Sequence, residues 1–178
     1  AKGPMARTAA LRRLRICVGV SPRLAEPQSV VAVELARELD YKLGKTAATR
    51  AMSVAALDLG IKANTPRMMS ERGIETHVLP ATATLDDVLA VQPDGLFFSN
   101  GPGDPEATGA YAVPMIQEIL SRSNIPVFGI CLGHQMLALA LGGKTLKMNH
   151  GHHGANHPVK DLETGKVEIT SMNHGFAV

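Results

Sequence analysis

The segment of this 178-residue chain best suited to chemistry is Gly129-Ile-Cys-Leu-Gly-His-Gln135, which places a cysteine between two glycines. An apolar, β-prone run precedes the cysteine at 125–130, and an apolar run typical of a helix follows at 135–141. A strand, a tight turn and a helix in this order form a nucleophile elbow, whose crowded central residue needs small neighbours. The N-terminus of the helix favours the thiolate form of such a cysteine. We therefore predict that Cys131 is a nucleophile for acyl transfer; a buried structural cysteine is the alternative.

A second glycine-rich loop follows the strand predicted at 95–99. Its residues, Asn100-Gly-Pro-Gly-Asp-Pro105, contain two glycines and two prolines and therefore form a rigid turn with accessible backbone N–H groups. In a parallel sheet this loop lies at the same carboxyl edge as Cys131. The backbone N–H groups of Gly103 and Leu132 are therefore candidate donors to an oxyanion. An ordinary β-turn is the alternative for this loop.

Four motifs occur in a defined order along the chain. After Asn100–Pro105 and Gly129–Gln135 come Gly151-His-His-Gly-Ala-Asn-His-Pro158 and Asn173-His-Gly-Phe-Ala-Val178. In this order they resemble the glutaminase domain of the class I glutamine amidotransferases, in the branch formed by carbamoyl-phosphate synthase small subunits. The resemblance begins near Val54 and continues to the last residue.

The resemblance implies a role for each matching residue. Cys131 attacks the side-chain amide of glutamine to form a glutamyl thioester, while the backbone amides of Gly103 and Leu132 hold the oxyanion. The glutamine pocket comprises Gly101, Gly103, Leu132, Gln135, Asn173, Gly175 and Phe176. The ammonia goes to a large synthetase subunit, which makes carbamoyl phosphate for arginine and pyrimidine biosynthesis. We expect no cofactor in this chain, because ATP and Mg belong to that partner.

The chain departs from the family at the catalytic base. The family carries this base in a His-Pro-Glu motif downstream of Asn-His-Gly-Phe, and no His-Pro-Glu occurs in the 178 residues. The family's amino-terminal domain is also not recognisable. We expect His134 to be a poor substitute, because the elbow directs its side chain elsewhere. These departures predict a fragment whose glutaminase activity is weak or absent.

Two other functions stay open. The first is a different cysteine hydrolase on the same fold, although such enzymes usually carry a histidine directly after the elbow cysteine, where this chain has Leu132. The second is a non-catalytic fragment that docks on the synthetase. Retained binding to the partner without release of ammonia distinguishes it from a glutaminase.

Charge divides the chain into two parts. Residues 1–50 contain ten Lys and Arg against four Asp and Glu, whereas residues 51–178 contain eight against twelve. We predict a basic linker or domain remnant over 1–50, with an amphipathic helix near 28–43. An amidotransferase domain, incomplete at its C-terminus, is predicted over 51–178. Pro4 and Pro22 disfavour a transit peptide or a helical nucleic-acid-binding arm.

The elements that position Cys131 follow an alternating β/α pattern. We expect strands at 53–59, 74–79, 95–99 and 125–130, a later strand at 166–170, and helices at 64–71, 85–91, 111–122 and 135–141. This alternation predicts an α/β fold with a doubly wound, mostly parallel sheet between two helical layers. The arrangement is flavodoxin-like and agrees with the resemblance to class I glutamine amidotransferases.

The remaining polar clusters are predicted to be structural. Five of the seven histidines follow residue 149, without a cysteine or carboxylate at a familiar metal-binding spacing, so we expect no metal site there; the resemblance implies a hydrogen-bonded structural loop at 151–158 instead. Asp86, Asp87, Asp104 and Glu106 are typical of loops and helix caps. Two cysteines do not make a disulfide framework, and no apolar run approaches the roughly 18 residues of a membrane span. We expect a cytoplasmic protein that binds neither nucleic acid nor membrane.

Overall fold

The computed structural model describes residues 51–162 and 164–178. The basic segment predicted over 1–50, with its helix near 28–43, lies outside the described residues and stays a prediction. Within the described ranges, no helix is long and apolar enough to cross a membrane.

Four parallel strands form the central sheet. They are β1 (Met52–Asp58), β2 (Ile74–Pro80), β3 (Gly95–Phe98) and β4 (Val127–Gly129), and their order across the sheet is β2-β1-β3-β4. Each agrees with a strand predicted from the sequence to within two residues at either end. β1, β3 and β4 are apolar runs, and Val54 to Leu57 have no exposed surface, as expected for strands covered on both faces; β2, at the edge of the sheet, also contains polar residues and is mostly exposed or half-buried.

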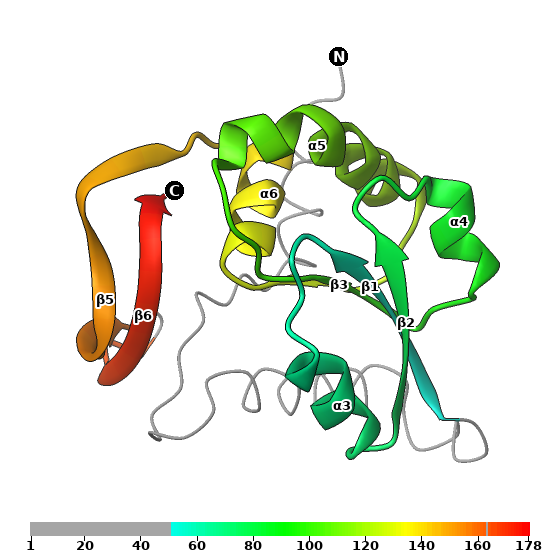
Figure 1. Ribbon diagram of the computed structural model, residues 1–178, viewed down its shortest axis with the longest axis horizontal. Helices are drawn as coiled ribbons and strands as arrows, with labels where there is room; N and C mark the ends of the chain where they lie inside the picture. Colours follow the sequence, from blue (N-terminus) through cyan, green and yellow to red (C-terminus); the bar gives the residue numbers. More distant parts are fainter. Residues whose placement is uncertain (1–50, 163) are drawn as a thin grey trace.

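Helices cover both faces of this sheet, as Figure 1 shows. The helices α4 (Leu85–Ala90), α5 (Pro105–Arg122) and α6 (Leu132–Ala140) lie on one face, and α3 (Asn64–Ser70) lies on the other. On the first face Leu57, Leu96 and Phe98 belong to one apolar core with residues of α4, α5 and α6. On the second face Val54, Phe97 and Phe128 form a separate core with Met69 of α3. The three-layer α/β fold with a doubly wound parallel sheet is therefore confirmed.

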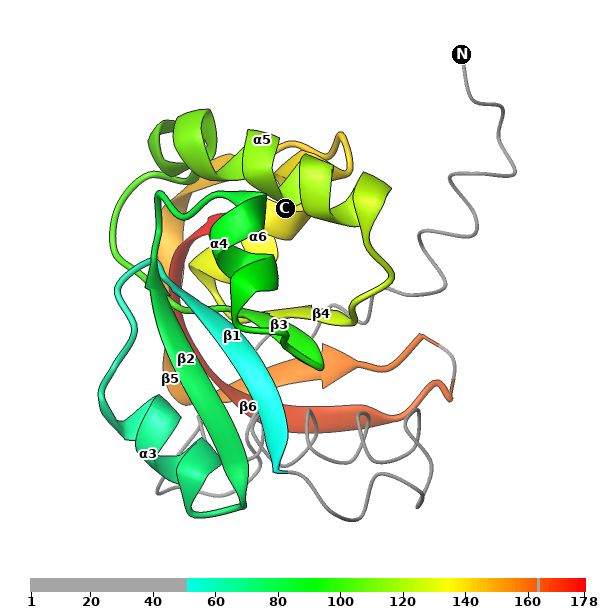
Figure 2. The same ribbon diagram turned by 90° about the vertical axis from the view of Figure 1, so that its right-hand side faces the viewer.

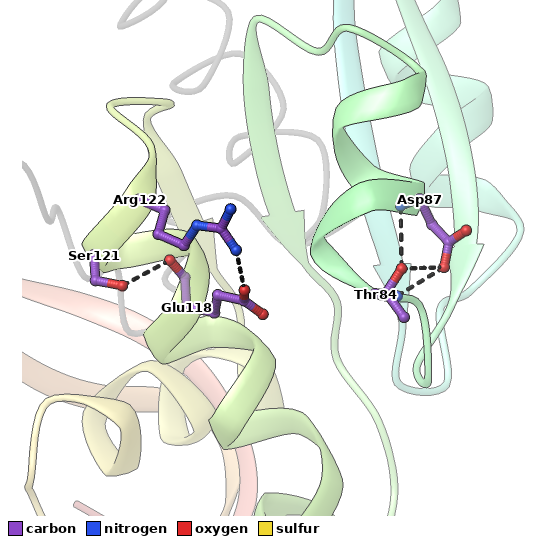
Figure 3. A network of polar contacts seen from close by, with 5 residues as sticks. All are labelled: Thr84, Asp87, Glu118, Ser121 and Arg122. Atoms are coloured by element: carbon purple, nitrogen blue, oxygen red, sulfur yellow. Dashed lines mark hydrogen bonds and ion pairs between the residues drawn. The ribbon is translucent and has the colours of Figure 1, made fainter.

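Polar caps define where two of these helices begin. The Thr84 hydroxyl accepts from the backbone N–H of Asp87, and the Asp87 carboxylate accepts from that of Thr84, a capping box that starts α4 (Figure 3). Asp104 caps α5 by accepting from the N–H of Glu106 at 2.8 Å. Pro105 is thus the first residue of α5, which begins six residues earlier than predicted. The expectation that Asp87 and Asp104 are capping residues is confirmed.

A separate antiparallel pair follows α6. It consists of β5 (Leu146–Lys160) and β6 (Val167–Ala177), and its register shifts between Lys147 and His152 and again before His157. The pair lies beside α6, away from α4 (Figures 1 and 2). The prediction of a loop at 151–158 is wrong, because pairing with β6 makes a strand of residues with low intrinsic β propensity. The strand predicted at 166–170 is the first part of the longer β6.

Candidate functional site

Cys131 occupies the sharp turn between β4 and α6. It is the N-cap residue of α6, with φ 53° and ψ −111°. A positive φ is unfavourable for any residue with a Cβ, and such strain costs about 1–3 kcal/mol. The strained strand–turn–helix backbone predicted from the sequence is therefore present. The reactivity of the thiol stays a prediction.

The two glycines flanking Cys131 are required by close backbone contacts. A Cβ on Gly129 would lie 2.6 Å from the carbonyl carbon of Gly133. A Cβ on Gly133 would lie 2.1 Å from the carbonyl oxygen of Phe98, at the end of β3. The elbow therefore packs against its own strand and against the neighbouring strand with no room for side chains.

The Asn100–Pro105 loop packs equally closely against the loop that follows β1. A Cβ on Gly101 would lie 1.8 Å from the carbonyl oxygen of Leu59, and one on Gly60 would lie 2.6 Å from Cδ of Pro102. The side-chain amide of Asn100 donates to the carbonyl of Gly60 at 3.1 Å. These contacts hold two backbone loops together at the carboxyl edge of the sheet, beside the elbow.

A cavity of about 660 Å³ lies between these loops, α6 and β6. It brings together five of the predicted site residues, Gly101, Cys131, Gln135, Asn173 and Phe176. The complete lining is Gly60, Lys62, Asn100, Gly101, Pro102, Ile130, Cys131, His134, Gln135, Ser171, Met172, Asn173, His174, Phe176, Ala177 and Val178. Motifs far apart in the sequence thus meet around one thiol.

Three predicted site residues are not part of the cavity lining. Gly103 is exposed, its φ is +102°, and a Cβ at this position would have no neighbouring atom within 4 Å. Leu132 is 2% exposed, and its side chain lies against Gly101. Gly175 also has open space at its Cβ position. The oxyanion role assigned to the backbone amides of Gly103 and Leu132, and the glutamine contact assigned to Gly175, stay predictions.

Gln135 ties the cavity wall on α6 to the wall on β6. Its side chain is 6% exposed, and Nε2 donates to the carbonyl oxygen of Phe176 at 3.0 Å. The same oxygen lies 2.8 Å from Nδ1 of His174, which must carry a proton to donate to it. Nε2 of His174 can then accept from Nδ1 of His152, 3.1 Å away on β5. Phe176 is therefore held from both α6 and the β5–β6 pair.

His134 lines the cavity beside Cys131, so the expectation that the elbow directs it elsewhere is wrong. His134 lies in the first turn of α6, which also supplies Gln135 to the cavity wall. Burial lowers the pKa of His134, and the nearby charge of His174 lowers it further. Its buried Nδ1 has no hydrogen-bond partner among the described residues. The neutral imidazole is therefore the form that this environment favours.

The histidines of β5 and β6 form a hydrogen-bonded cluster. The ring of His152 lies 5.0 Å from that of His157 and 4.9 Å from that of His174. His153 Nδ1 is 2.8 Å from Oδ1 of Asn173. Desolvation lowers the pKa of His152, and the charges of His174, His157 and His153 lower it further. In the described part of the chain, no group of three or more His, Cys, Asp or Glu side chains could hold a metal ion.

Sequence reasoning missed several wall residues, including Lys62, Met172 and His174. Lys62 follows β1 at the same sheet edge as Asn100, so the edge argument that located the Asn100–Pro105 loop could also have located Lys62. Met172 and His174 lie on β6, and their approach to Cys131 depends on where the β5–β6 pair packs. No local pattern in the sequence indicates that packing.

Comparison with known proteins gives concordant matches. Residues 55–178 match the family model described as "Glutamine amidotransferase class-I". The carbamoyl phosphate synthase small chain of Ruegeria pomeroyi is 74% identical over 125 residues, which cover 70% of this chain and 32% of that protein. The same protein of Brucella ovis is 62% identical over 151 residues, covering 85% and 37% respectively. The chain spans about a third of the length of these curated relatives.

A solved structure supports the fold assignment. The crystal structure of a putative GMP synthase protein from Thermoplasma acidophilum aligns with a TM-score of 0.52 at 23% identity, covering 61% of this chain and 56% of that one. At this identity the likeness concerns the fold alone. The family match from residue 55 to residue 178 takes in the parallel sheet, the strained Cys131 elbow and the β6 wall of the cavity. This chain therefore belongs to the class I glutamine amidotransferase family.

Proposed function

We propose that this chain is the glutaminase part of a carbamoyl-phosphate synthase small chain and that Cys131 attacks glutamine. The observation that carries the proposal is the strained Cys131 in a cavity wall shared with Gly101, Gln135, Asn173 and Phe176. A thiol at a helix N-terminus, facing a cavity with polar groups, is suited to nucleophilic attack on an amide. The family description "Glutamine amidotransferase class-I" supports glutamine as the substrate, and the names of the Ruegeria and Brucella relatives support the assignment to a carbamoyl phosphate synthase small chain.

The proposed reaction has two halves. In the first, the sulfur of Cys131 forms a bond to the side-chain amide carbon of glutamine, the C–N bond breaks, and nitrogen takes up the proton that the thiol has lost and leaves as ammonia. Backbone N–H groups of Gly103 and Leu132 are proposed to stabilise the oxyanion before the C–N bond breaks. In the second, water adds to the thioester, loses a proton and releases glutamate and the thiol.

We also propose a partner for the product. The large subunit of carbamoyl-phosphate synthase is expected to receive the ammonia and to use it with bicarbonate and ATP. In this proposal ATP and Mg act on that partner, the present chain needs no cofactor, and the complex works in the cytoplasm. The relatives named as small chains of this synthase support the assignment.

Acid quenching tests the first half-reaction directly. The chain is incubated with radiolabelled glutamine, quenched in acid, digested and analysed by mass spectrometry. We expect a glutamyl adduct on the peptide containing Cys131 and none in a Cys131→Ala variant. Cys17, the other cysteine in the chain, serves as an internal reference thiol. A parent chain without adduct would contradict attack on glutamine by Cys131 in this chain and favour a non-catalytic docking fragment.

A further inference from the structure

Ser99 lies at the junction of three segments that line the cavity, although it is not part of the lining itself. It directly follows β3 and has no exposed surface. Its hydroxyl accepts from the backbone N–H of Leu59 at 2.9 Å and donates to the carbonyl of Asn100 at 2.8 Å. Its own carbonyl accepts from the backbone N–H of Gly133 at 3.0 Å. One buried serine is thus bonded to the loop after β1, the Asn-Gly-Pro-Gly loop and the elbow.

Each of these bonds lies next to residues of the cavity wall. Leu59 precedes Gly60, Asn100 precedes Gly101, and Gly133 lies two residues after Cys131. The three segments approach so closely that a Cβ on Gly101 or Gly133 would overlap a neighbouring carbonyl oxygen. Because close-packed backbone segments transmit small displacements, the bonds of Ser99 affect the positions of all three.

We propose that Ser99 is a positioning residue for the glutamine site. Its hydroxyl sets the distance between the loop after β1 and the Asn100–Pro105 loop. Its carbonyl, by accepting from Gly133, fixes the position of the Cys131 elbow relative to β3. Ser99 acts through these backbone segments and touches neither the substrate nor the thiol. This inference rests on the proposed glutaminase function for its effect on glutamine, but its effect on the backbone is independent of that function.

Ser99→Ala removes the hydroxyl, so the buried N–H of Leu59 keeps only its 3.2 Å bond to the Leu57 carbonyl, and the carbonyl of Asn100 loses this donor. The chain offers a matched control in Ser53, which lies on β1 and is 2% exposed. The buried Ser53 hydroxyl has no hydrogen-bond partner among the described residues. Ser53→Ala therefore removes the same atom from another buried serine without breaking a side-chain hydrogen bond among the described residues.

The first measurement is the alkylation of Cys131 by iodoacetamide in the presence of increasing glutamine. We expect the glutamine concentration for half-maximal protection to rise about tenfold in Ser99→Ala, or about 1.4 kcal/mol, and to stay unchanged in Ser53→Ala. Ser99→Thr retains the hydroxyl and is expected to stay within about threefold of the parent, about 0.65 kcal/mol. A glutamine concentration for half-maximal protection in Ser99→Ala that lies within twofold of the parent's value would overturn the proposal.

Hydrogen exchange separates this inference from the proposed function. In Ser99→Ala we expect faster exchange in peptides that cover 57–62, 99–103 and 131–135, and no change in Ser53→Ala. If the parent shows no protection by glutamine but Ser99→Ala shows this exchange pattern, the proposed function fails and the positioning role stands. Faster exchange confined to Leu59 would overturn the positioning role. If Ser99→Ala does not fold, Ser99→Cys, with a weaker donor of similar shape, replaces it in the exchange measurement with the same expectation.

Discussion

At the scale of single residues, the motifs that predict the site are those that follow strands. Gly101 and Cys131 were predicted to lie together because both follow parallel strands, and the structure places both in one cavity wall. His134 was expected to face elsewhere, yet its position one helical turn after Cys131 brings it to the same wall.

Gly133→Ala tests the close approach of the elbow to β3. A Cβ at this position would lie 2.1 Å from the Phe98 carbonyl oxygen, so backbone must move. We expect the free energy of unfolding to fall by about 3 kcal/mol in a denaturant titration. Gly175→Ala, where a Cβ meets nothing within 4 Å, is the control and is expected to change it by less than about 0.5 kcal/mol. Equal effects of the two substitutions would contradict the packing described for the elbow.

Acidification is expected to destabilise the fold through His134. Burial lowers the pKa of His134 below its ordinary value of 6.5, so the folded chain binds this proton less tightly than the unfolded chain. The contribution of His134 to stability is therefore complete above pH 6.5 and is lost as pH falls through its lowered pKa. Denaturant titrations from pH 7.5 downward should show a smaller loss of stability in His134→Gln than in the parent. The exposed His150→Gln is the control, and an unchanged slope in His134→Gln would oppose this account.

At the scale of elements, apolar runs predict the parallel strands well, whereas β5 could not be predicted. The runs at β1, β3 and β4 are buried, and burial of this kind selects the apolar, β-branched and aromatic residues seen there, whereas the edge strand β2 is mostly exposed or half-buried. By contrast, β5 contains two glycines, a proline and four histidines and shows no regular alternation. Its conformation depends on pairing with β6, a non-local interaction that its own residues do not indicate. The early start of α5, however, was visible in the Asp104-Pro105 pair.

Thr84→Ala tests the capping box of α4. The substitution removes the hydroxyl that accepts from the Asp87 N–H and donates to its carboxylate (Figure 3). We expect thermal or chemical unfolding to report a loss of about 1 kcal/mol. Thr82→Ala, at an exposed position just before the helix, serves as the control and is expected to stay within about 0.5 kcal/mol of the parent. A loss as large in Thr82→Ala would show that the cap is not the cause.

Gln135→Leu tests the attachment of β6 to α6. It removes the bond from Nε2 to the Phe176 carbonyl, so we expect faster hydrogen exchange in the peptide covering 171–178 and a stability loss of about 1 kcal/mol. Gln117→Leu is the matched control, because Gln117 Nε2 makes the same type of hydrogen bond, to the Ala140 carbonyl at the far end of α6. It should lower stability by a similar amount without changing exchange in β6. Unchanged exchange in Gln135→Leu would contradict the attachment.

At the scale of the whole molecule, the cavity is a composite of two sheets. The parallel sheet supplies the loops and the elbow at its carboxyl edge, and β6 of the antiparallel pair closes the cavity, together with Val178 that follows it. The part of the cavity that the parallel sheet builds was predictable from the β/α alternation, because that pattern determines which loops lie at the same edge of the sheet. The part that β6 builds depends on the packing of β6 against α6, to which the hydrogen bond from Gln135 to Phe176 contributes. The proposed glutamine site therefore requires both parts of the fold.

The most direct test of this account is covalent labelling by a diazo-ketone analogue of glutamine, read by intact and peptide mass spectrometry. We predict a single adduct on Cys131, suppressed by free glutamine and absent in Cys131→Ser. Equal labelling of Cys17 and Cys131, or labelling of Cys131 that glutamine does not suppress, would contradict a preformed glutamine site around the elbow.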